Sequence, residues 1–150
     1  MPTYTCFAAR GFLSAEQRQR IAAGITRIHS EATGTPIAFT QCIFQDIDDA
    51  GHFIGGAPAP RESVWVYGHL RDGRTAAVKA QILAGVRDLV IEVAQTEPYL
   101  VWVYINELAH TDMVEFGHVL PEQGHEARWL EQLPDELRDH LIALGDNAFA

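Results

Sequence analysis

The sequence of 150 residues contains little cysteine and little positive charge, and it lacks any long apolar run. Its two cysteines, Cys6 and Cys42, do not have the spacing of metal ligands, and we expect both to be free thiols in a reducing compartment. No apolar stretch is long enough to cross a membrane. Eleven basic residues against 20 acidic ones give a formal charge of −9, which argues against nucleic acid or an anionic membrane surface as a partner.

What remains is the composition of an ordinary globular protein. Hydrophobic residues make up 47% of the chain and charged residues 21%, which is typical of a domain that buries a substantial core. The length favours a single domain, 1–150. No charged and apolar leader segment precedes the first predicted strand, so we expect a cytoplasmic protein.

The first residues alternate polar and apolar side chains directly after the start methionine. This alternation predicts a strand over residues 2–8. Proline beside the initiator favours removal of Met1, so we expect the mature chain to begin with the secondary amine of Pro2. Such an amine could act as an acid, a base or a nucleophile near neutral pH, because burial or nearby cations lower its pKa. The alternative is that Pro2 only permits processing and begins an edge strand.

The following segment predicts a helix and a second strand. Ser14 and Gln17 have the spacing of a capping box, apolar side chains then recur at the helical period, and Gly34 ends the helix. A strand follows over 39–47. The segment 52–60, rich in glycine and proline, predicts a short hairpin or loop.

The same order of elements returns 61 residues later, so that Ser14 corresponds to Thr75. A strand is predicted over 63–70, a turn over 71–74, a helix from Thr75 and a strand over 100–105. Two βαβ units, each with a right-handed crossover, can share one sheet.

We therefore predict an α/β (α+β) fold in which units 2–47 and 63–107 form one mixed four-stranded sheet with two helices on one face. The other face must then be covered, most easily by further subunits.

The remaining residues, 108–150, form a carboxy-terminal extension that departs from the repeat. We expect a short strand over 113–117 and a connector over 120–126. Two short helices are predicted over 127–133 and 134–144, with Pro134 in the first turn of the second. Residues 146–150 are predicted to be a frayed tail.

Two βαβ units behind an amino-terminal proline resemble the tautomerase superfamily. Within it, the chain looks most like the cis-3-chloroacrylic acid dehalogenase family, over nearly its whole length. The resemblance implies catalysis without a metal or an organic cofactor, and a homotrimer. It also implies a set of six catalytic residues, all present at the family spacing. They are Pro2, His29, Arg71, Arg74, Tyr104 and Glu115.

The chemistry that the resemblance implies suits these residue types. Arg71 and Arg74 flank Gly73 before a predicted helix, so they could bind the carboxylate of a small anionic substrate through forked hydrogen bonds. The positive end of the helix dipole would assist them.

Water could then add to C3 of a 3-haloacrylate. Glu115 would take a proton from that water, and Tyr104 and His29 would help to hold it. Protonated Pro2 would deliver a proton to C2. The resulting halohydrin would collapse to malonate semialdehyde and halide.

Each residue also has a purely structural interpretation. His29 borders the buried stripe of its helix, where a hydrogen-bonded core histidine is common. Arg71 and Arg74 could be solvated turn charges, and Tyr104 could pack on the sheet. Glu115 alone indicates almost nothing. The joint occurrence of all six residues is what favours an active site.

We expect a cofactor-independent hydratase or hydrolytic dehalogenase that acts on 3-haloacrylic or related unsaturated carboxylic acids. The first alternative is an enol–keto tautomerase in which Pro2 is the general base and Glu115 is incidental. The second is a non-enzymatic, cytokine-like ligand-binding protein of the same fold. Substrate choice would depend on the residues that shape the pocket. We expect these to include Thr33, Thr35, Phe39 and Phe116.

Overall fold

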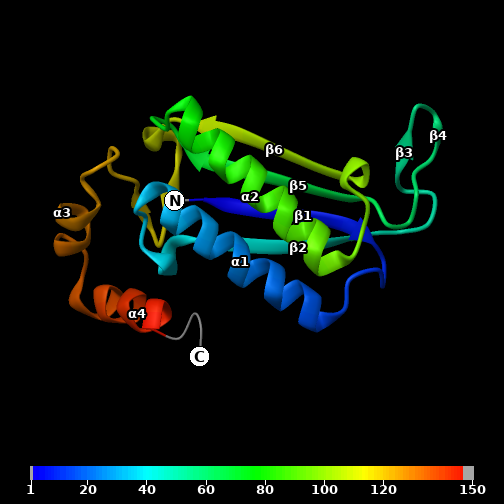
Figure 1. Cartoon of the computed structure of the whole chain (residues 1–150). Helices are drawn as coiled ribbons and strands as arrows, with labels where there is room; N and C mark the ends of the chain where they lie inside the picture. Colours follow the sequence, from blue (N-terminus) through cyan, green and yellow to red (C-terminus); the bar gives the residue numbers. More distant parts are fainter. Residues whose placement is uncertain (1, 147–150) are drawn as a thin grey trace.

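A mixed four-stranded sheet with two long helices on one face forms the centre of the structure (Figure 1). This computed structural model describes residues 2–146. The strands lie in the order β2 (Gln41–Ile47), β1 (Thr3–Ala9), β5 (Val64–Arg71) and β6 (Val101–Leu108). Strands β1 and β2 are parallel, as are β5 and β6, whereas β1 and β5 are antiparallel. The predicted fold class is confirmed.

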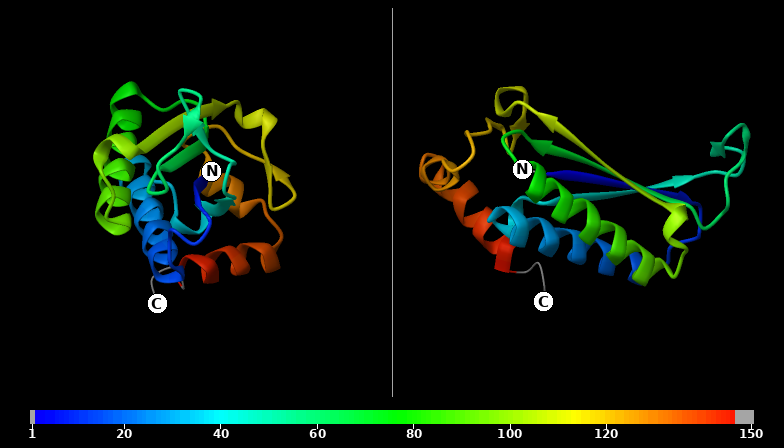
Figure 2. Two further views of the ribbon diagram at one scale, coloured as in Figure 1. Left: turned by 90° about the vertical axis from the view of Figure 1, so that its right-hand side faces the viewer. Right: turned by 45° about the horizontal axis from the view of Figure 1, so that its top comes forward.

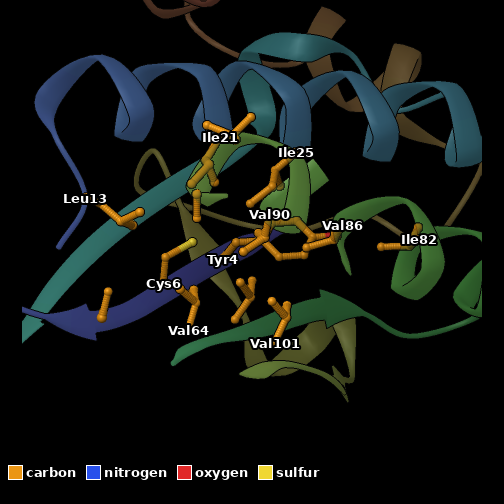
Figure 3. Close-up of a cluster of buried hydrophobic side chains, with 14 of the residues drawn as sticks. Tyr4, Cys6, Leu13, Ile21, Ile25, Val64, Ile82, Val86, Val90 and Val101 are labelled. Atoms are coloured by element: carbon orange, nitrogen blue, oxygen red, sulfur yellow. The ribbon is translucent and has the colours of Figure 1, made fainter. Parts of the chain in front are cut away.

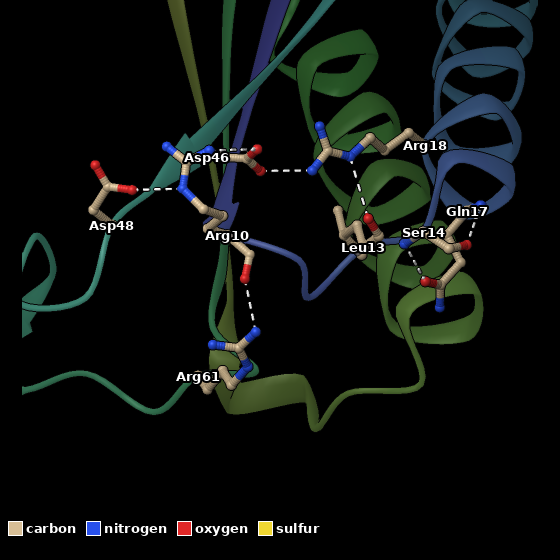
Figure 4. Close-up of polar contacts among 8 residues, drawn as sticks. All are labelled: Arg10, Leu13, Ser14, Gln17, Arg18, Asp46, Asp48 and Arg61. Carbon is tan, nitrogen blue, oxygen red and sulfur yellow. Dashed lines mark hydrogen bonds and ion pairs between the residues drawn. The ribbon is translucent and has the colours of Figure 1, made fainter.

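The two helices, α1 (Ala15–Thr33) and α2 (Ala76–Ala94), begin at the predicted caps. The Ser14 hydroxyl accepts a hydrogen bond from the Gln17 backbone N–H (3.1 Å), and the Gln17 side chain accepts one from the Ser14 N–H (2.9 Å; Figure 4). At the start of α2, the Thr75 hydroxyl accepts a single hydrogen bond from the Val78 N–H (3.2 Å). Helix α1 is followed by Gly34 in the left-handed conformation, as expected. Such caps fix the helix boundaries because they satisfy backbone groups that the helix leaves unpaired.

The two units repeat in space as they do in sequence. Both helices cross at a glycine, and in each case the opposing side chain belongs to the other unit. A Cβ added to Gly24 would lie 2.5 Å from Leu89, and one added to Gly85 would lie 3.0 Å from Ile28. Gly24 and Gly85, like Ile28 and Leu89, are 61 residues apart. The repeat therefore describes an approximate two-fold relation between the helices.

The main core lies between the sheet and these helices (Figure 3). Its most deeply buried side chains alternate along the strands and follow one stripe of each helix. They include Tyr4, Cys6, Ile21, Ile25, Val64, Val66, Ile82, Val86 and Val90. Both cysteines are free, and burial raises the pKa of each thiol to about 12. The thiols are therefore protonated at neutral pH.

The opposite face of the sheet carries a group of aromatic side chains, which we call the aromatic face. It consists of Phe7, Trp65, Tyr67, Trp102 and Tyr104. The Phe7 and Trp65 rings stack with centroids 4.9 Å apart, and Tyr104 meets Trp65 edge to face. Trp102 and Tyr104 remain 43% and 48% exposed. An aromatic surface of this kind is typical of an interface.

Two appendages extend from opposite ends of the sheet (Figure 2). One is the predicted hairpin, β3 (Phe53–Ile54) and β4 (Ala57–Pro58). The other is the carboxy-terminal extension, which lies beside the start of β1. Its elements are η3 (His110–Asp112), β7 (Val114–Glu115), β8 (His118–Val119), α3 (Glu126–Glu131) and α4 (Asp135–Asp146).

The carboxy-terminal extension has a small core of its own. Phe39 contributes to it from the first unit, together with Met113, Leu120, Trp129, Leu133 and Leu141. Trp129 Nε1 donates a hydrogen bond to the Val119 carbonyl (2.9 Å). These contacts hold the extension at the end of the sheet where the chain begins.

The structure differs from the sequence predictions at several element ends. A 3-10 turn, η1 (Ile37–Phe39), occupies the start of the strand predicted from residue 39, and η2 (Pro98–Leu100) is its repeat. Strand β6 runs beyond its predicted end to Leu108, because it pairs with the whole of β5. The strand predicted over 113–117 is a hairpin instead.

At the carboxy-terminal end, Pro134 immediately precedes α4 rather than lying inside its first turn. Asp146 ends that helix, and the rest of the predicted tail lies outside the described residues. Within residues 2–146, no helix is both long enough and apolar enough to cross a membrane.

Candidate active site

The pairing of β1 with β5 places the start of the chain beside the end of β5. Thr3 pairs with His69 on one side and with Gln41 on the other, and the Pro2 carbonyl accepts a hydrogen bond from the Gln41 N–H (3.0 Å). Because β1 and β5 are antiparallel, the beginning of one lies beside the end of the other. Pro2, which is buried, therefore lies at the same end of the sheet as Arg71.

His29, near the end of α1, points into this end of the core. Its side chain is 1% exposed, and Nδ1 lies 2.8 Å from the hydroxyl of Tyr4. The Tyr4 ring fits because its partner across the strands is Gly68. A Cβ on Gly68 would lie 2.7 Å from the ring. Sequence reasoning missed Tyr4, which has the alternating pattern of an ordinary strand residue.

The Tyr4–His29 pair is neutral at physiological pH. Burial, assisted by the positive charges of Arg74, the amino terminus and Arg71, lowers the pKa of His29 to about 3. Burial also raises the pKa of Tyr4. The imidazole therefore offers one N–H and one lone pair, and the hydroxyl keeps its proton.

Of the two predicted arginines, Arg71 is buried and Arg74 is half-buried. Arg71 is 3% exposed; its Nη1 donates to the Pro121 carbonyl (2.7 Å) and its Nη2 pairs with Glu126. Burial and the neighbouring charge of Arg71 lower the pKa of Arg74. Among the described residues, neither Arg71 Nε nor Arg74 Nε has a hydrogen-bond partner. Two neighbouring guanidinium groups, each with an unpaired Nε donor, suit an anion with two oxygens.

Two threonines link the end of α1 to Arg74. The Thr33 hydroxyl donates to the His29 carbonyl (2.7 Å) and lies 2.9 Å from the Thr35 hydroxyl. Arg74 Nη2 donates to that same Thr35 oxygen (3.2 Å). Thr33 and Thr35 therefore link the His29 backbone to the Arg74 side chain and fix their relative positions.

Glu115 ends β7, in a hairpin beside the start of the chain. Burial raises its pKa, and the positive charges of the amino terminus and Arg71 oppose that shift. The hairpin turns through Phe116 and Gly117, both with positive φ (52° and 80°), as a two-residue hairpin requires. Phenylalanine is an uncommon residue in that conformation. The turn places the Phe116 ring beside that of Phe39, with the two ring centroids 6.2 Å apart.

An open groove of about 1260 Å³ runs along this end of the molecule. Residues from both units and from the extension line it, including Pro2, Phe39, His69, Met113, Glu115 and Phe116. Sequence reasoning left His69 unassigned. Its only signal was its position two residues before Arg71. No group of three or more His, Cys, Asp or Glu within residues 2–146 is arranged to hold a metal ion.

Of the six predicted site residues, Pro2 and Glu115 line this groove. Tyr104 lies farther away, outside this end of the sheet. It lies on the aromatic face, paired with Tyr67. Leu108, which lines the groove, is four residues farther along β6, a distance of ~13 Å in a strand. His29, Arg71 and Arg74 lie at the same end of the sheet as the groove but are not among the residues that line it.

The opposite end of the sheet has no equivalent site. Adding 61 to Pro2 gives Ser63, and adding 61 to His29 gives Val90. Arg10 corresponds to Arg71 but is exposed and pairs with Asp48 at 2.6 Å (Figure 4). Each chain therefore carries this set of residues once.

Comparison with known proteins agrees with the fold. Residues 1–133 match the family described as "Putative oxalocrotonate tautomerase enzyme". No curated protein sequence matches the chain. The chain is 34% identical to N1, a member of the cis-3-chloroacrylic acid dehalogenase family. That similarity covers 94% of this chain and 99% of N1, with a TM-score of 0.91.

Two further solved structures have lower sequence identity. Native Ps01740 is 28% identical over 75% of this chain and 99% of its own, with a TM-score of 0.72. The F6 fused 4-OT wild-type asymmetric trimer is 20% identical over 78% of this chain and 94% of its own, also with a TM-score of 0.72. At that identity it shows the shared fold alone.

The chain thus belongs to the tautomerase superfamily and, within it, to the cis-3-chloroacrylic acid dehalogenase family. This membership supports an enzymatic role.

The low pKa of His29 predicts a pH dependence of stability. An unfolded histidine titrates near ~6.5, so the unfolded state binds this proton more readily than the folded one. The contribution of His29 to the free energy of unfolding is complete above pH ~6.5 and is lost as the pH falls toward about 3. The free energy of unfolding should fall by up to ~1.4 kcal/mol per pH unit in this range.

Urea unfolding of the wild type and of His29→Gln between pH 7.5 and 4 measures this contribution. The difference in unfolding free energy between the two should shrink as the pH falls. A constant difference would show that His29 keeps an ordinary pKa in the folded state.

Proposed function

We propose that this protein is a cofactor-independent hydratase or hydrolytic dehalogenase of 3-haloacrylic or related unsaturated carboxylic acids. The observation that supports this most strongly is the meeting of unlike groups at one end of the sheet. The buried Arg71 and the half-buried Arg74, a carboxylate with a raised pKa and the start of the chain lie together there. Water addition to a conjugated acid needs an anion site, a base and a proton donor.

The arginines would bind the substrate. Arg71 Nε and Arg74 Nε are buried donors without partners among the described residues, and a buried unpaired donor is costly. A substrate carboxylate would satisfy them and gain charge-assisted hydrogen bonds. Negative charge builds up on this carboxylate as water attacks C3. The two arginines would therefore both bind the substrate and stabilise the transition state.

Glu115 would be the general base and Pro2 the acid. The water oxygen bonds to C3 while one of its protons passes to Glu115. Pro2, in its protonated form after loss of Met1, gives a proton to C2. The product is a 3-halo-3-hydroxy acid, which loses hydrogen halide to form malonate semialdehyde. The raised pKa of Glu115 brings it closer to the range in which a carboxylate is an effective base.

A tautomerase is the second candidate function. The family match, described as "Putative oxalocrotonate tautomerase enzyme", supports it directly. In this reaction Pro2, as a neutral amine, would move a proton between carbon and oxygen of an enol, and Glu115 would not be needed as a base. The two functions therefore differ in their dependence on one side chain.

We further propose that the chain forms a homotrimer in which the aromatic face is buried. Trp102 and Tyr104 are exposed in one chain, and a face of this composition is best covered by another copy. The F6 fused 4-OT structure is a trimer. Tyr104 lies too far along β6 from the groove of its own chain, so it would act in the site of a neighbouring subunit.

Replacing Glu115 separates the two functions. Glu115→Gln keeps the shape of the side chain but cannot accept a proton, so water addition to 3-chloroacrylate should fall by ~10²–10⁴. Ketonisation of phenylenolpyruvate should stay within about tenfold. Halide release and enol absorbance measure the two activities.

Glu122→Gln is the control, because it removes the same charge from an exposed side chain. An equal loss of both activities in Glu115→Gln would contradict the role as water-activating base. Undiminished hydration would exclude it.

Mixed oligomers test the role of Tyr104. Tyr104→Phe and Arg71→Ala should each be impaired alone. Because the two residues would meet only across an interface, a coexpressed mixture should recover about a quarter of wild-type activity by random assembly. Light scattering of the purified mixture should give the mass of a trimer. A monomer, or a trimer without recovered activity, would contradict the shared site.

A further inference from the structure

The connector, residues 120–126, crosses both arginines of the candidate site. Its Pro121 carbonyl accepts from Arg71 Nη1, and Glu126 pairs with Arg71 Nη2. The Gln123 amide, in the orientation that satisfies both of its groups, accepts from Arg74 Nη1 (2.8 Å) and donates to the Gly73 carbonyl (2.7 Å). The same short segment therefore supplies an acceptor to each guanidinium group.

Gly73 allows the connector to approach this closely. Its φ is +91°, and a Cβ there would lie 2.8 Å from the Gln123 side chain. The connector is also anchored at both ends. Leu120 is 2% exposed and donates its N–H to the Met113 carbonyl (3.1 Å), while Trp129 packs against Phe39. Because the connector is held at both ends, it can fix the positions of the arginine side chains that it contacts.

Glu126 is the only acidic side chain that the described residues present within ion-pair distance of Arg71. Both partners are well covered, with side chains 2% and 19% exposed. A buried pair of this kind restricts the guanidinium to one orientation, and loss of one partner leaves the other charge unpaired. With Nη1 and Nη2 occupied by the connector, Nε is the donor of Arg71 that lacks a partner among the described residues.

We propose that Glu126 is a positioning residue that holds Arg71 by Nη2 and so leaves its Nε free for the substrate carboxylate. The proposal rests on the proposed function, in which Arg71 and Arg74 bind that carboxylate. Glu126 would not touch the substrate. It acts through Arg71. Because the core of the carboxy-terminal extension fixes the connector, the Arg71 guanidinium keeps this orientation before a ligand binds.

A competing explanation is that the pair merely holds the carboxy-terminal extension in place. The two explanations differ in what Glu126→Gln should do. Glutamine keeps an oxygen that can accept from Nη2, so it preserves the orientation of Arg71. Alanine removes the acceptor and lets the guanidinium turn away.

The test measures binding of propanoate, an inert carboxylate, by NMR titration of Glu126→Ala, Glu126→Gln and Arg71→Ala. We expect Glu126→Ala to bind about tenfold more weakly than wild type or worse, as expected for loss of a charge-assisted hydrogen bond. Glu126→Gln should remain within about threefold. Glu122→Gln, in the same connector but on an exposed side chain, should bind like wild type.

The indole N–H signal of Trp129 reports the extension, because that group donates to Val119. It should not move in Glu126→Ala. A moved signal would show that Glu126 holds the extension, which overturns the positioning role. Binding by Glu126→Ala equal to wild type, or by Glu126→Gln as weak as by Glu126→Ala, would also overturn it.

The Arg71→Ala variant separates this failure from failure of the proposed function. If Arg71→Ala weakens binding but Glu126→Ala does not, only the positioning role is wrong. If Arg71→Ala binds propanoate like wild type, the carboxylate site and the positioning role both fail. Should Glu126→Ala not fold, Glu126→Asp keeps the charge but shortens the side chain, and it should weaken binding in the same direction.

Discussion

The antiparallel pairing of β1 with β5 is the constraint on which the rest of the site depends. It joins the two βαβ units and sets the beginning of the chain beside Arg71, because Thr3 pairs with His69. A slip of one residue would turn every side chain of β1 to the other face and expose Tyr4, which is fully buried against the helices. The packing of Tyr4 against Gly68 therefore fixes the register and, with it, the position of Pro2.

Positive charge is concentrated at one place in a protein whose formal charge is −9. Arg71 is buried and Arg74 is half-buried, which is costly unless each is given hydrogen-bond partners. Those partners come from two parts of the chain: Thr35 after α1, and Pro121 and Glu126 in the connector. Burial lowers the pKa of His29 and the resulting field adds to this shift, whereas at Glu115 the field opposes the effect of burial. The electrostatics of the groups proposed to react thus depend on the extension as well as on the repeat.

Much of the fold followed from local signals in the sequence. The caps at Ser14 and Thr75 and the 61-residue repeat predicted both helices, because capping and hydrophobic period are properties of short segments. The contacts of Tyr4 with His29 and of Glu126 with Arg71 could not be predicted in this way, since each joins residues that are distant in sequence. The six proposed site residues came from the family resemblance, and their roles stay predictions. For Tyr104, one chain shows why a spacing pattern is not enough: the residue lies on the aromatic face, away from the groove, and its proposed role requires a neighbouring subunit.

The central claim is that the amine of Pro2 performs the chemistry. The most direct measurement is intact mass followed by peptide mapping after treatment with an activated alkynyl ketone, which adds to an accessible nucleophilic amine. We predict a chain that lacks Met1 and carries a single adduct on Pro2, with activity lost in proportion to labelling. Active protein that retains Met1, or inactivation by an adduct on another residue such as Lys79, would contradict the account.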